Sequence, residues 1–276
     1  MGKLYICGTP IGNLEDASIR LLRILRRVDL IACEDTRHTL RLLNRYHIKK
    51  PLLSYHEHSK PEKEDHIIRL LEGGKNIALV SDAGMPAISD PGERLVKKAI
   101  EAGIDLEVVP GPSASVSALA LSGMDTDAFV FEGFLPARSS PRRAKLEALK
   151  EESRTIILYE APHRLSACLE DIKAIFGEER RIAVVRELTK IHEEVKRGSV
   201  AELCAFYSLN PPRGEISLII AGKPAAAEAK SLPAIAREVE ELLQKGMDKK
   251  EAFKLKAREY GIKKSTLYKY FLEIKE

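Results

Sequence analysis

The run that decides the fold is residues 77–86, IALVSDAGMP, in which four apolar residues precede a loop of small and polar residues. Four apolar residues bounded by turn-forming residues are typical of a buried strand. Residues 93–102 have the apolar spacing of a helix, and residues 105–109 predict the next strand. A strand, a helix and a second strand in this order form a crossover unit, so we expect parallel strands and an α/β fold.

The same alternation extends in both directions from this run. Toward the N-terminus we expect strands at 4–7, 30–33 and 52–55, and helices at 17–28, 35–47 and 63–71. A second set follows, with helices at 115–121 and 165–176 and strands at 128–131, 155–159, 181–186 and 216–221. Between them, residues 138–143 (RSSPRR) are expected to form an exposed flexible loop.

These elements divide the chain into three parts. We predict an N-terminal α/β domain at 1–114, a second α/β domain at 115–224 and a helical tail at 230–276, with a linker over 223–231. In the tail, Asp248 is a helix cap, and a Gly-containing turn at 260–262 separates two helices. This pattern favours a helix-turn-helix, although a hairpin used for packing or dimerisation has the same pattern.

Composition places the chain among globular proteins. It has 276 residues, 44% of them hydrophobic and 31% charged. Its apolar runs are too short to cross a bilayer and its N-terminus lacks a signal-peptide core, so we expect a cytoplasmic protein. The four scattered cysteines predict buried thiols, not disulfides or a zinc site. The nearest approach to metal-ligand spacing is 56–58 (HEH), which lacks further ligands, so no metal is expected.

The excess positive charge lies entirely in the tail. Residues 230–276 contain 12 Lys and Arg against 8 Asp and Glu, which leaves 33 of each in the rest of the chain. A basic helical tail favours contact with nucleic acid; the other interpretation is an ordinary solvated helix face.

Three loops rich in Gly and Pro follow predicted strands, at 8–13, 81–86 and 110–114. Because ligands bind at the carboxyl ends of parallel strands, we expect the loops to line one cleft. Neither a Gly-x-Gly-x-x-Gly motif after the first strand nor a Gly-Lys-Ser/Thr phosphate loop is present. A dinucleotide oxidoreductase and an NTPase are therefore disfavoured, and a ligand without a pyrophosphate, such as an adenosyl sulfonium, fits better.

The motifs at 8–14 (GTPIGNL), 81–92 (SDAGMPAISDPG) and 109–114 (VPGPSA) resemble those of the tetrapyrrole methylase superfamily. Residues 33–39 (CEDTRHT), 158–164 (LYEAPHR) and 186–190 (RELTK) resemble its branch that 2′-O-methylates a decoding-region cytidine of 16S ribosomal RNA. The resemblance covers about residues 3–222 and recurs in the tail. It implies two α/β domains with S-adenosylmethionine in the cleft between them, a homodimer, and small-subunit RNA or the assembled subunit as partner.

By motif position, the resemblance implies a cofactor shell made of Thr9, Pro10, Asp82, Met85, Ser113, Ala114, Tyr159, Leu188 and Ile216. Asp82 directly follows a strand, where its carboxylate can bind the cofactor or cap the turn above Gly84. Ser113 and Ala114 open a helix whose free N–H groups can meet polar groups of the cofactor.

Methylation of a ribose hydroxyl needs a group that removes or polarises its proton. Candidates are Glu34, Asp35, His56, Glu160 and Lys190. For RNA phosphates we expect contacts from Arg37, His38, Arg138, Arg142, Arg143, Lys263 and Lys264. Structural roles compete with these: a helix start at 34–38, a salt bridge between Glu160 and Arg164, and surface charges elsewhere.

Two other functions share parts of this pattern. A tetrapyrrole or corrin-precursor methyltransferase would have the same loops but no need of the arginines or basic tail. A non-enzymatic regulator would read nucleic acid with the tail and sense a ligand with the α/β body; the acidic and histidine motifs near the cleft argue against it. The absence of Trp favours a ribose over a flipped base as acceptor, since flipped bases commonly stack on aromatic rings.

Overall fold

The computed structural model describes residues 1–56, 59, 61–224 and 231–273. The chain forms two compact units, Met1–Gly222 and Lys223–Glu276, which are described separately. Within the described ranges, no helix is both long and apolar enough to span a membrane. All four cysteines are free and buried, as predicted.

The first sheet is parallel throughout, with strand order β3-β2-β4-β1-β5. The strands coincide closely with the predicted apolar runs: β1 Lys3–Cys7, β2 Leu30–Cys33, β3 Leu52–Ser54, β4 Ile77–Val80 and β5 Asp105–Val109. The prediction of crossover-connected parallel strands is confirmed.

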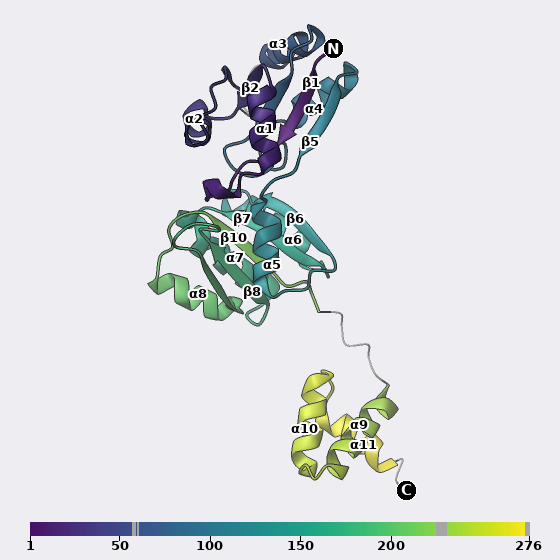
Figure 1. Cartoon of the computed structure of the whole chain (residues 1–276). Coiled ribbons are helices and arrows are strands. Elements are labelled where there is room, and N and C mark those ends of the chain that lie inside the picture. Colours follow the sequence, from purple (N-terminus) through teal and green to yellow (C-terminus); the bar gives the residue numbers. More distant parts are fainter. Residues whose placement is uncertain (57–58, 60, 225–230, 274–276) are drawn as a thin grey trace. The chain divides into compact units, whose positions relative to one another are not determined.

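Helices cover both faces of this sheet (Figure 1). On one face pack α1 (Ile19–Arg27) and α2 (Thr36–Arg45), on the other α3 (Pro61–Glu72) and α4 (Glu93–Glu101). A short 3-10 helix, η1 (Leu14–Asp16), precedes α1. The sheet is therefore the central layer of an α/β sandwich, and only its strand ends are left for a site.

The second sheet has the order β6-β7-β10-β8-β9. Its strands are β6 Phe129–Phe134, β7 Thr155–Glu160, β8 Arg181–Arg186, β9 Glu194–Ser199 and β10 Ile216–Ile220. Only β6 and β7 pair in parallel; the other neighbours are antiparallel. Side chains alternate between faces, so that Ile182 and Val184 join one core cluster and Ala183 and Val185 the other.

One face of this sheet is covered by α5 (Ala114–Ser122) and the other by α6 (Ser139–Leu149), α7 (Leu165–Phe176) and α8 (Val200–Leu209), with η2 (Pro162–Arg164) before α7. The expected flexible loop at 138–143 is wrong, because α6 starts at Ser139. Leu146 and Leu149 bury the helix against the core, which the polar start of the segment conceals. The predicted domain boundary after residue 114 lies at the start of α5, between the two sheets.

The second unit contains three helices in its described part: α9 (Leu232–Gln244), α10 (Lys249–Glu259) and α11 (Lys264–Glu273). They share a core that includes Val239, Phe253 and Leu267. Asp248 caps α10 as predicted, its carboxylate accepting from the backbone N–H groups of Lys250 and Glu251 at 2.8 and 3.1 Å. Six residues of the predicted linker, 225–230, lie outside the described residues.

At the carboxyl ends of β1 and β5 two glycines touch through their backbones. A Cβ at Gly8 would lie 2.8 Å from the Cα of Gly111, and a Cβ at Gly111 would lie 2.7 Å from the carbonyl oxygen of Gly8. Only glycine fits at both positions, and the approach brings the first and third Gly/Pro loops together.

Candidate active site

Two of the three Gly/Pro loops are tied to each other at the sheet edge. Thr9 and Gly84 form an isolated bridge, in which the Thr9 N–H donates to the Gly84 carbonyl at 2.9 Å and the Gly84 N–H donates back at 3.1 Å. Two cavities lie at this edge, and Ile11 and Ala83 line both. The single cleft expected from the sequence is therefore divided.

The first unit has two halves, one built around each sheet. The larger cavity has a volume of about 540 Å³ and is lined by residues of both halves. Its size lies in the range of small-molecule sites. Six of the nine residues predicted to bind the cofactor line it: Met85, Ser113, Ala114, Tyr159, Leu188 and Ile216.

Tyr159 of β7 joins the two halves at this cavity. Its hydroxyl accepts a hydrogen bond from the Ser115 N–H, in the first turn of α5, at 3.1 Å. Its ring meets that of Phe131 edge-on, with centroids 5.0 Å apart. Burial raises the pKa of the Tyr159 phenol, so it stays a neutral hydrogen-bonding group. Apolar walls, a fixed phenol and a helix start offer what an adenosyl sulfonium needs.

The smaller cavity has a volume of about 260 Å³ and is lined by the other three predicted cofactor residues, Thr9, Pro10 and Asp82. Lys190 and Glu215 reach it from the second half of the unit. His38 and Arg41 reach it from α2. Positively charged side chains, those of Arg41 and Lys190, line this cavity but not the larger one.

Asp82 is anchored to the neighbouring loop. Its Oδ1 accepts a hydrogen bond from the Asp35 N–H at 3.0 Å, which fixes the connection between β2 and α2. Asp35 in turn caps α2 by accepting from the Arg37 N–H at 2.8 Å. The carboxylate of Asp35 also pairs with the Arg37 guanidinium at 2.7 Å, and this hydrogen bonding lowers the pKa of Asp35 to about 2. Asp35 is thus a weak proton acceptor, and its helix-capping role is the one that the contacts support.

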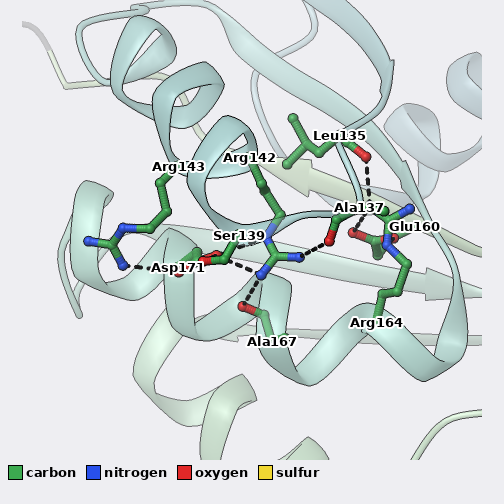
Figure 2. Close-up of polar contacts among 9 residues, drawn as sticks. All are labelled: Leu135, Ala137, Ser139, Arg142, Arg143, Glu160, Arg164, Ala167 and Asp171. Atoms are coloured by element: carbon green, nitrogen blue, oxygen red, sulfur yellow. Dashed lines mark hydrogen bonds and ion pairs between the residues drawn. The ribbon is translucent and has the colours of Figure 1, made fainter.

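Glu160 borders the larger cavity but is only 2% exposed. Its Oε1 lies 3.0 Å from Nε of Arg164 and accepts from the Ala161 N–H at 2.8 Å. Arg164 also donates to the Leu135 carbonyl at 2.6 Å (Figure 2). The predicted salt bridge between Glu160 and Arg164 is confirmed, and it holds η2 against β6 and β7.

Lys190 lies between two acids. Its Nζ is 2.8 Å from Glu187 and 2.9 Å from Glu215, and hydrogen bonds to these carboxylates favour its charged form, so its pKa is raised despite burial. Glu187 and Thr189 have positive φ values of 53° and 65°, unusual for residues with side chains. The loop is held in a strained form beside the cavity, with its lysine cationic and unsuited to remove a proton.

The remaining base candidates lie outside the cavity walls. His56 is exposed, and its backbone N–H donates to the Ser59 hydroxyl at 2.9 Å. Glu34 is half-buried, and its negative charge raises the pKa of a neighbouring acid, Asp90. Glu57 and His58, from the same motif as His56, lie outside the described residues. No cluster of three metal-binding side chains occurs in the described part of the chain.

The arginines expected to meet RNA divide into two kinds. Arg142 is 5% exposed, and its guanidinium lies 2.7 Å from Asp171 while donating to the Ala137 and Ala167 carbonyls at 3.3 and 3.4 Å (Figure 2). The predicted RNA contact of Arg142 is wrong, because its donors are used inside the fold. Arg143 also reaches Asp171, at 3.0 Å, but its side chain is half exposed, and Arg138 is exposed before α6.

The other predicted RNA contacts lie in two places. Arg37 is exposed but paired with Asp35, whereas His38 lines the smaller cavity. Lys263 is exposed just before α11, and Lys264 is its first residue. They belong to the second unit, which is described by itself.

Asp90 and Arg41 are two of the cavity residues that the sequence did not single out. Asp90 lines the larger cavity, and burial together with the charges of Glu34 and Asp82 raises its pKa to about 7. Arg41 lines the smaller cavity, and no hydrogen bond or ion pair ties its side chain to another described residue. Its spacing of three from His38 on a predicted helix was the available signal for Arg41.

Comparison with known proteins gives consistent results. The family model of Tetrapyrrole (Corrin/Porphyrin) Methylases matches residues 3–204. The chain is 46% identical to the Ribosomal RNA small subunit methyltransferase I of Synechocystis sp. over 275 residues, which cover 99% of each protein. It is 47% identical to the protein of the same name from Escherichia coli O157:H7, over 99% of this chain and 95% of that one. The relative from Thermotoga maritima is 52% identical over 223 residues, 81% of this chain and all of that protein.

Solved structures share the fold at lower identity. A uroporphyrin-III-C-methyltransferase from Thermus thermophilus superposes with a TM-score of 0.57 at 22% identity, over 80% of this chain and 94% of that one. A cobalt precorrin-4 methyltransferase superposes with a TM-score of 0.61 at 20% identity, over 79% and 94%. At this identity the likeness concerns the fold alone, and it agrees with the predicted pair of α/β domains.

Proposed function

The chain belongs to the tetrapyrrole methylase family and uses S-adenosylmethionine as its methyl donor, and on that premise we propose that it methylates the RNA of the small ribosomal subunit. The acceptor is the ribose 2′-hydroxyl of a decoding-region cytidine. The observation that carries the proposal is identity of 46% over 99% of both chains with a relative named for that RNA. The motifs at 33–39, 158–164 and 186–190 support the ribose acceptor.

We assign the cofactor to the larger cavity. S-adenosylmethionine, when bound, supplies an electrophilic methyl group whose sulfur leaves without needing a proton. Met85, Leu188 and Ile216 offer apolar contacts there, while Ser113 and the Tyr159 hydroxyl offer polar ones. Because both halves of the unit contribute walls, the cofactor is enclosed between them, and the reacting groups are kept in line and away from water.

The smaller cavity suits the ribose-phosphate backbone of the acceptor. His38 and Arg41 face it from α2, and Lys190 faces it from the strained loop at 187–190. These groups hold phosphates beside the cofactor, and Asp82 fixes the loop that carries α2 through its bond to the Asp35 N–H. Positioning of the hydroxyl then provides much of the rate acceleration.

Further RNA contacts are proposed for Arg138 and Arg143 at α6 and for Lys263 and Lys264 of the second unit. Each unit has its own hydrophobic core, so removal of residues 223–276 is expected to leave the cofactor site intact. RNA affinity should fall and depend less on salt, since fewer counterions are released on binding. An unchanged salt dependence would make the tail a packing or dimerisation element.

The oligomeric state and the cellular location of the protein are also proposed. We propose a homodimer, which light scattering of the full chain measures directly. We also propose that the protein works in the cytoplasm, where its RNA substrate lies.

The decisive experiment is incubation with S-adenosylmethionine labelled in its methyl group and either small ribosomal subunits, their naked RNA or tetrapyrrole precursors. Label in RNA is expected, at a nucleotide whose adjacent phosphodiester resists alkali, because a 2′-O-methyl group blocks attack by that hydroxyl. An alkali-sensitive linkage would indicate a base methyl. Label in tetrapyrroles would favour the corrin-type alternative, and label in neither would favour a binding regulator.

The cofactor assignment has its own test. Ala114→Phe puts an aromatic ring into the wall of the larger cavity and should weaken binding of S-adenosylmethionine by at least about tenfold, because the ring would occupy part of the space assigned to the ligand. Ala205→Phe, on the exposed side of α8, is the matched control. Calorimetry on both variants measures the effect, and equal affinities would move the cofactor elsewhere.

A further inference from the structure

Asp90 is a half-buried carboxylate in the wall of the larger cavity. It lies in the connection between β4 and α4, eight residues after Asp82. Met85 and Ser89 of the same connection line the cavity beside it. The carboxylate therefore borders the space assigned to the cofactor, whose methyl group the acceptor hydroxyl must reach, although its own sequence context, Ser-Asp-Pro-Gly, is that of an ordinary turn.

The backbone that carries Asp90 is strained. Ala87 and Ser89 both have left-handed conformations, with φ of 69° and 58°. The Ala87 N–H donates to the Pro91 carbonyl at 3.2 Å, which closes the turn around Asp90. Ser89 packs on β6, where a Cβ at Gly133 would come within 2.7 Å of its hydroxyl. Side-chain-bearing residues keep such conformations only where the surroundings enforce them, and these sites cluster where a group must be held in place.

The charged groups that act on Asp90 come from neighbouring elements. Glu34 follows β2 and Asp82 follows β4, and both disfavour its ionised form. A hydrogen bond between Ser81 and the carboxylate has the opposite effect and lowers the pKa of Asp90. Tyr159 of β7 lines the same cavity, and the charge of Asp90 raises the pKa of its phenol. Burial is the largest effect, and together these bring the pKa of Asp90 to about 7. Near neutral pH the group is thus divided between its acid and base forms.

A general base works best when its pKa lies near the working pH. The other acids and bases here are less suited: Asp35 has a pKa of about 2, Lys190 is kept cationic by two acids, and Glu160 is held by Arg164. Asp90 differs from them in facing the cavity with like-charged neighbours instead of a cation.

We propose that Asp90 is the proton acceptor of the methyl transfer. This rests on the proposed function. The acceptor oxygen forms its bond to the methyl carbon as the carbon–sulfur bond breaks, and its proton passes to the Asp90 carboxylate. The products are a methyl ether, a neutral thioether and a protonated Asp90, which releases its proton to water before the next turnover.

The test uses the full-length protein, small ribosomal subunits and labelled S-adenosylmethionine, with single-turnover rates measured from about pH 5.5 to about pH 9. The wild-type rate should rise with pH and level off with a midpoint near 7, as Asp90 ionises. Asp90→Asn, which keeps the shape but cannot take a proton, should lower the plateau rate by about a hundredfold or more. Its affinity for S-adenosylmethionine should stay within about threefold, because the lost group acts on the acceptor.

A second variant tests the protonation step itself. Glu34→Gln removes one like charge and should shift the midpoint of the wild-type profile to lower pH, because the pKa of Asp90 falls. Asp127→Asn, at an exposed position outside both cavities, is the control and should reproduce the wild-type profile.

Three results would overturn the proposal: an Asp90→Asn rate near that of the wild type, a slow Asp90→Asn variant that keeps the wild-type midpoint, or a Glu34→Gln profile that does not move. The last measurement stands even if Asp90→Asn fails to fold. Methyl transfer by the wild type to small subunits tests the proposed function, and only the variants test Asp90, so the two failures are distinguishable.

Discussion

Asp171 on α7 and Asp90 at the larger cavity are two sequestered aspartates with opposite surroundings. Asp171 meets Arg142 at 2.7 Å and Arg143 at 3.0 Å, and these bonds lower its pKa in spite of burial. Asp90 instead faces Glu34 and Asp82, and its pKa rises to about 7. Asp171 is therefore held in its charged form, whereas Asp90 can gain or lose a proton near neutral pH.

The arginines of the two regions differ in the same way. Arg142 uses its donors on Asp171 and two carbonyls, whereas no hydrogen bond or ion pair holds the Arg41 side chain within the described part of the chain. A charge already satisfied inside the fold contributes to stability, and one left unsatisfied at a cavity is available to a ligand. This distinction can be tested by measuring the stability of variants in the first region and the stability and ligand binding of variants in the second.

The largest effect is expected at Asp171. Asp171→Ala leaves Arg142, 5% exposed, without its counter-charge. Breaking a buried pair in this way typically costs about 3–5 kcal/mol of unfolding free energy. Urea denaturation should show this loss, while cofactor affinity of the folded fraction stays unchanged because Asp171 lines neither cavity.

The control is Glu93→Ala, which breaks the exposed pair between Glu93 and Lys97. Exposed pairs contribute about 0–1 kcal/mol. Equal losses in the two variants would mean that the Arg142 pair is no more structural than a surface pair, and RNA binding by Arg142 would have to be reconsidered.

A smaller and mixed effect is expected at Arg164. Arg164→Ala leaves Glu160, whose side chain is 1% exposed, with its bond from the Ala161 N–H but no cation. We expect a loss of about 2–3 kcal/mol, less than for Asp171, because one hydrogen bond remains. Glu160 also lines the larger cavity, so binding of S-adenosylmethionine should weaken as well. Calorimetry measures the affinity of this variant for S-adenosylmethionine. An unchanged affinity would mean that Glu160, like Asp171, has only a structural role.

Removing the charge of Asp90 should stabilise the protein at alkaline pH, whereas removing that of Asp171 should destabilise it. The folded-state pKa of Asp90, about 7, lies above the ordinary value of 3.8, so its contribution to stability is present below about pH 4 and is lost as the pH rises through 7. The shift corresponds to at most about 4 kcal/mol, and solvent screening reduces this to about 1–2 kcal/mol. Asp90→Asn should therefore be more stable than the wild type at about pH 8, with little difference at about pH 4.

Denaturation at the two pH values measures this gain. Asp35→Asn is the opposing control, since the pKa of Asp35 is lowered to about 2 and its charged form is the stabilising one. That variant should lose stability at neutral pH. A loss at Asp90→Asn as well would mean that Asp90, like Asp171, is a structural anion.

The smallest effect is expected at Arg41. Arg41→Ala should weaken binding of small-subunit RNA about threefold to tenfold and reduce the slope of log affinity against log salt by about one, the value for one phosphate contact. Arg45→Ala, on the same helix but outside the cavity wall, is the control. Fluorescence titration at several salt concentrations compares them, and equal slopes would mean that the smaller cavity does not hold the RNA backbone.

The sequence predicts most of the first sheet because its strands are short apolar runs between turns. Residues 30–33, 77–80 and 105–109 were predicted to the residue. The second sheet was predicted less fully. Strand β9 has the sequence EVKRGS and lies at the sheet edge, where charged side chains are tolerated and the alternation of a buried strand is lost.

The sequence indicates the candidate site where it depends on loops, but not where it depends on pairs of residues that are distant in sequence. The Gly/Pro loops, each of which follows an apolar strand, line the two cavities at the edge of the sheet where a cleft was expected. The role of Arg142 is set by Asp171, 29 residues away in sequence, and that of Asp90 by burial together with the charges of Glu34 and Asp82. Such partners appear only when the fold brings them together, so residue type alone suggested RNA contact for Arg142 and did not single out Asp90.

The contact between Gly8 and Gly111 has a consequence for how this chain can diverge. Each position excludes a side chain because the other's backbone occupies the space, so a change at either one is not rescued by a change at its partner. Compensating pairs of substitutions, which let most cores drift, are closed to these two residues. Homologues that keep β1 and β5 in this register should therefore retain both glycines long after the surrounding strands have been replaced. A deep mutational scan should show both positions intolerant, independently and without epistasis between them.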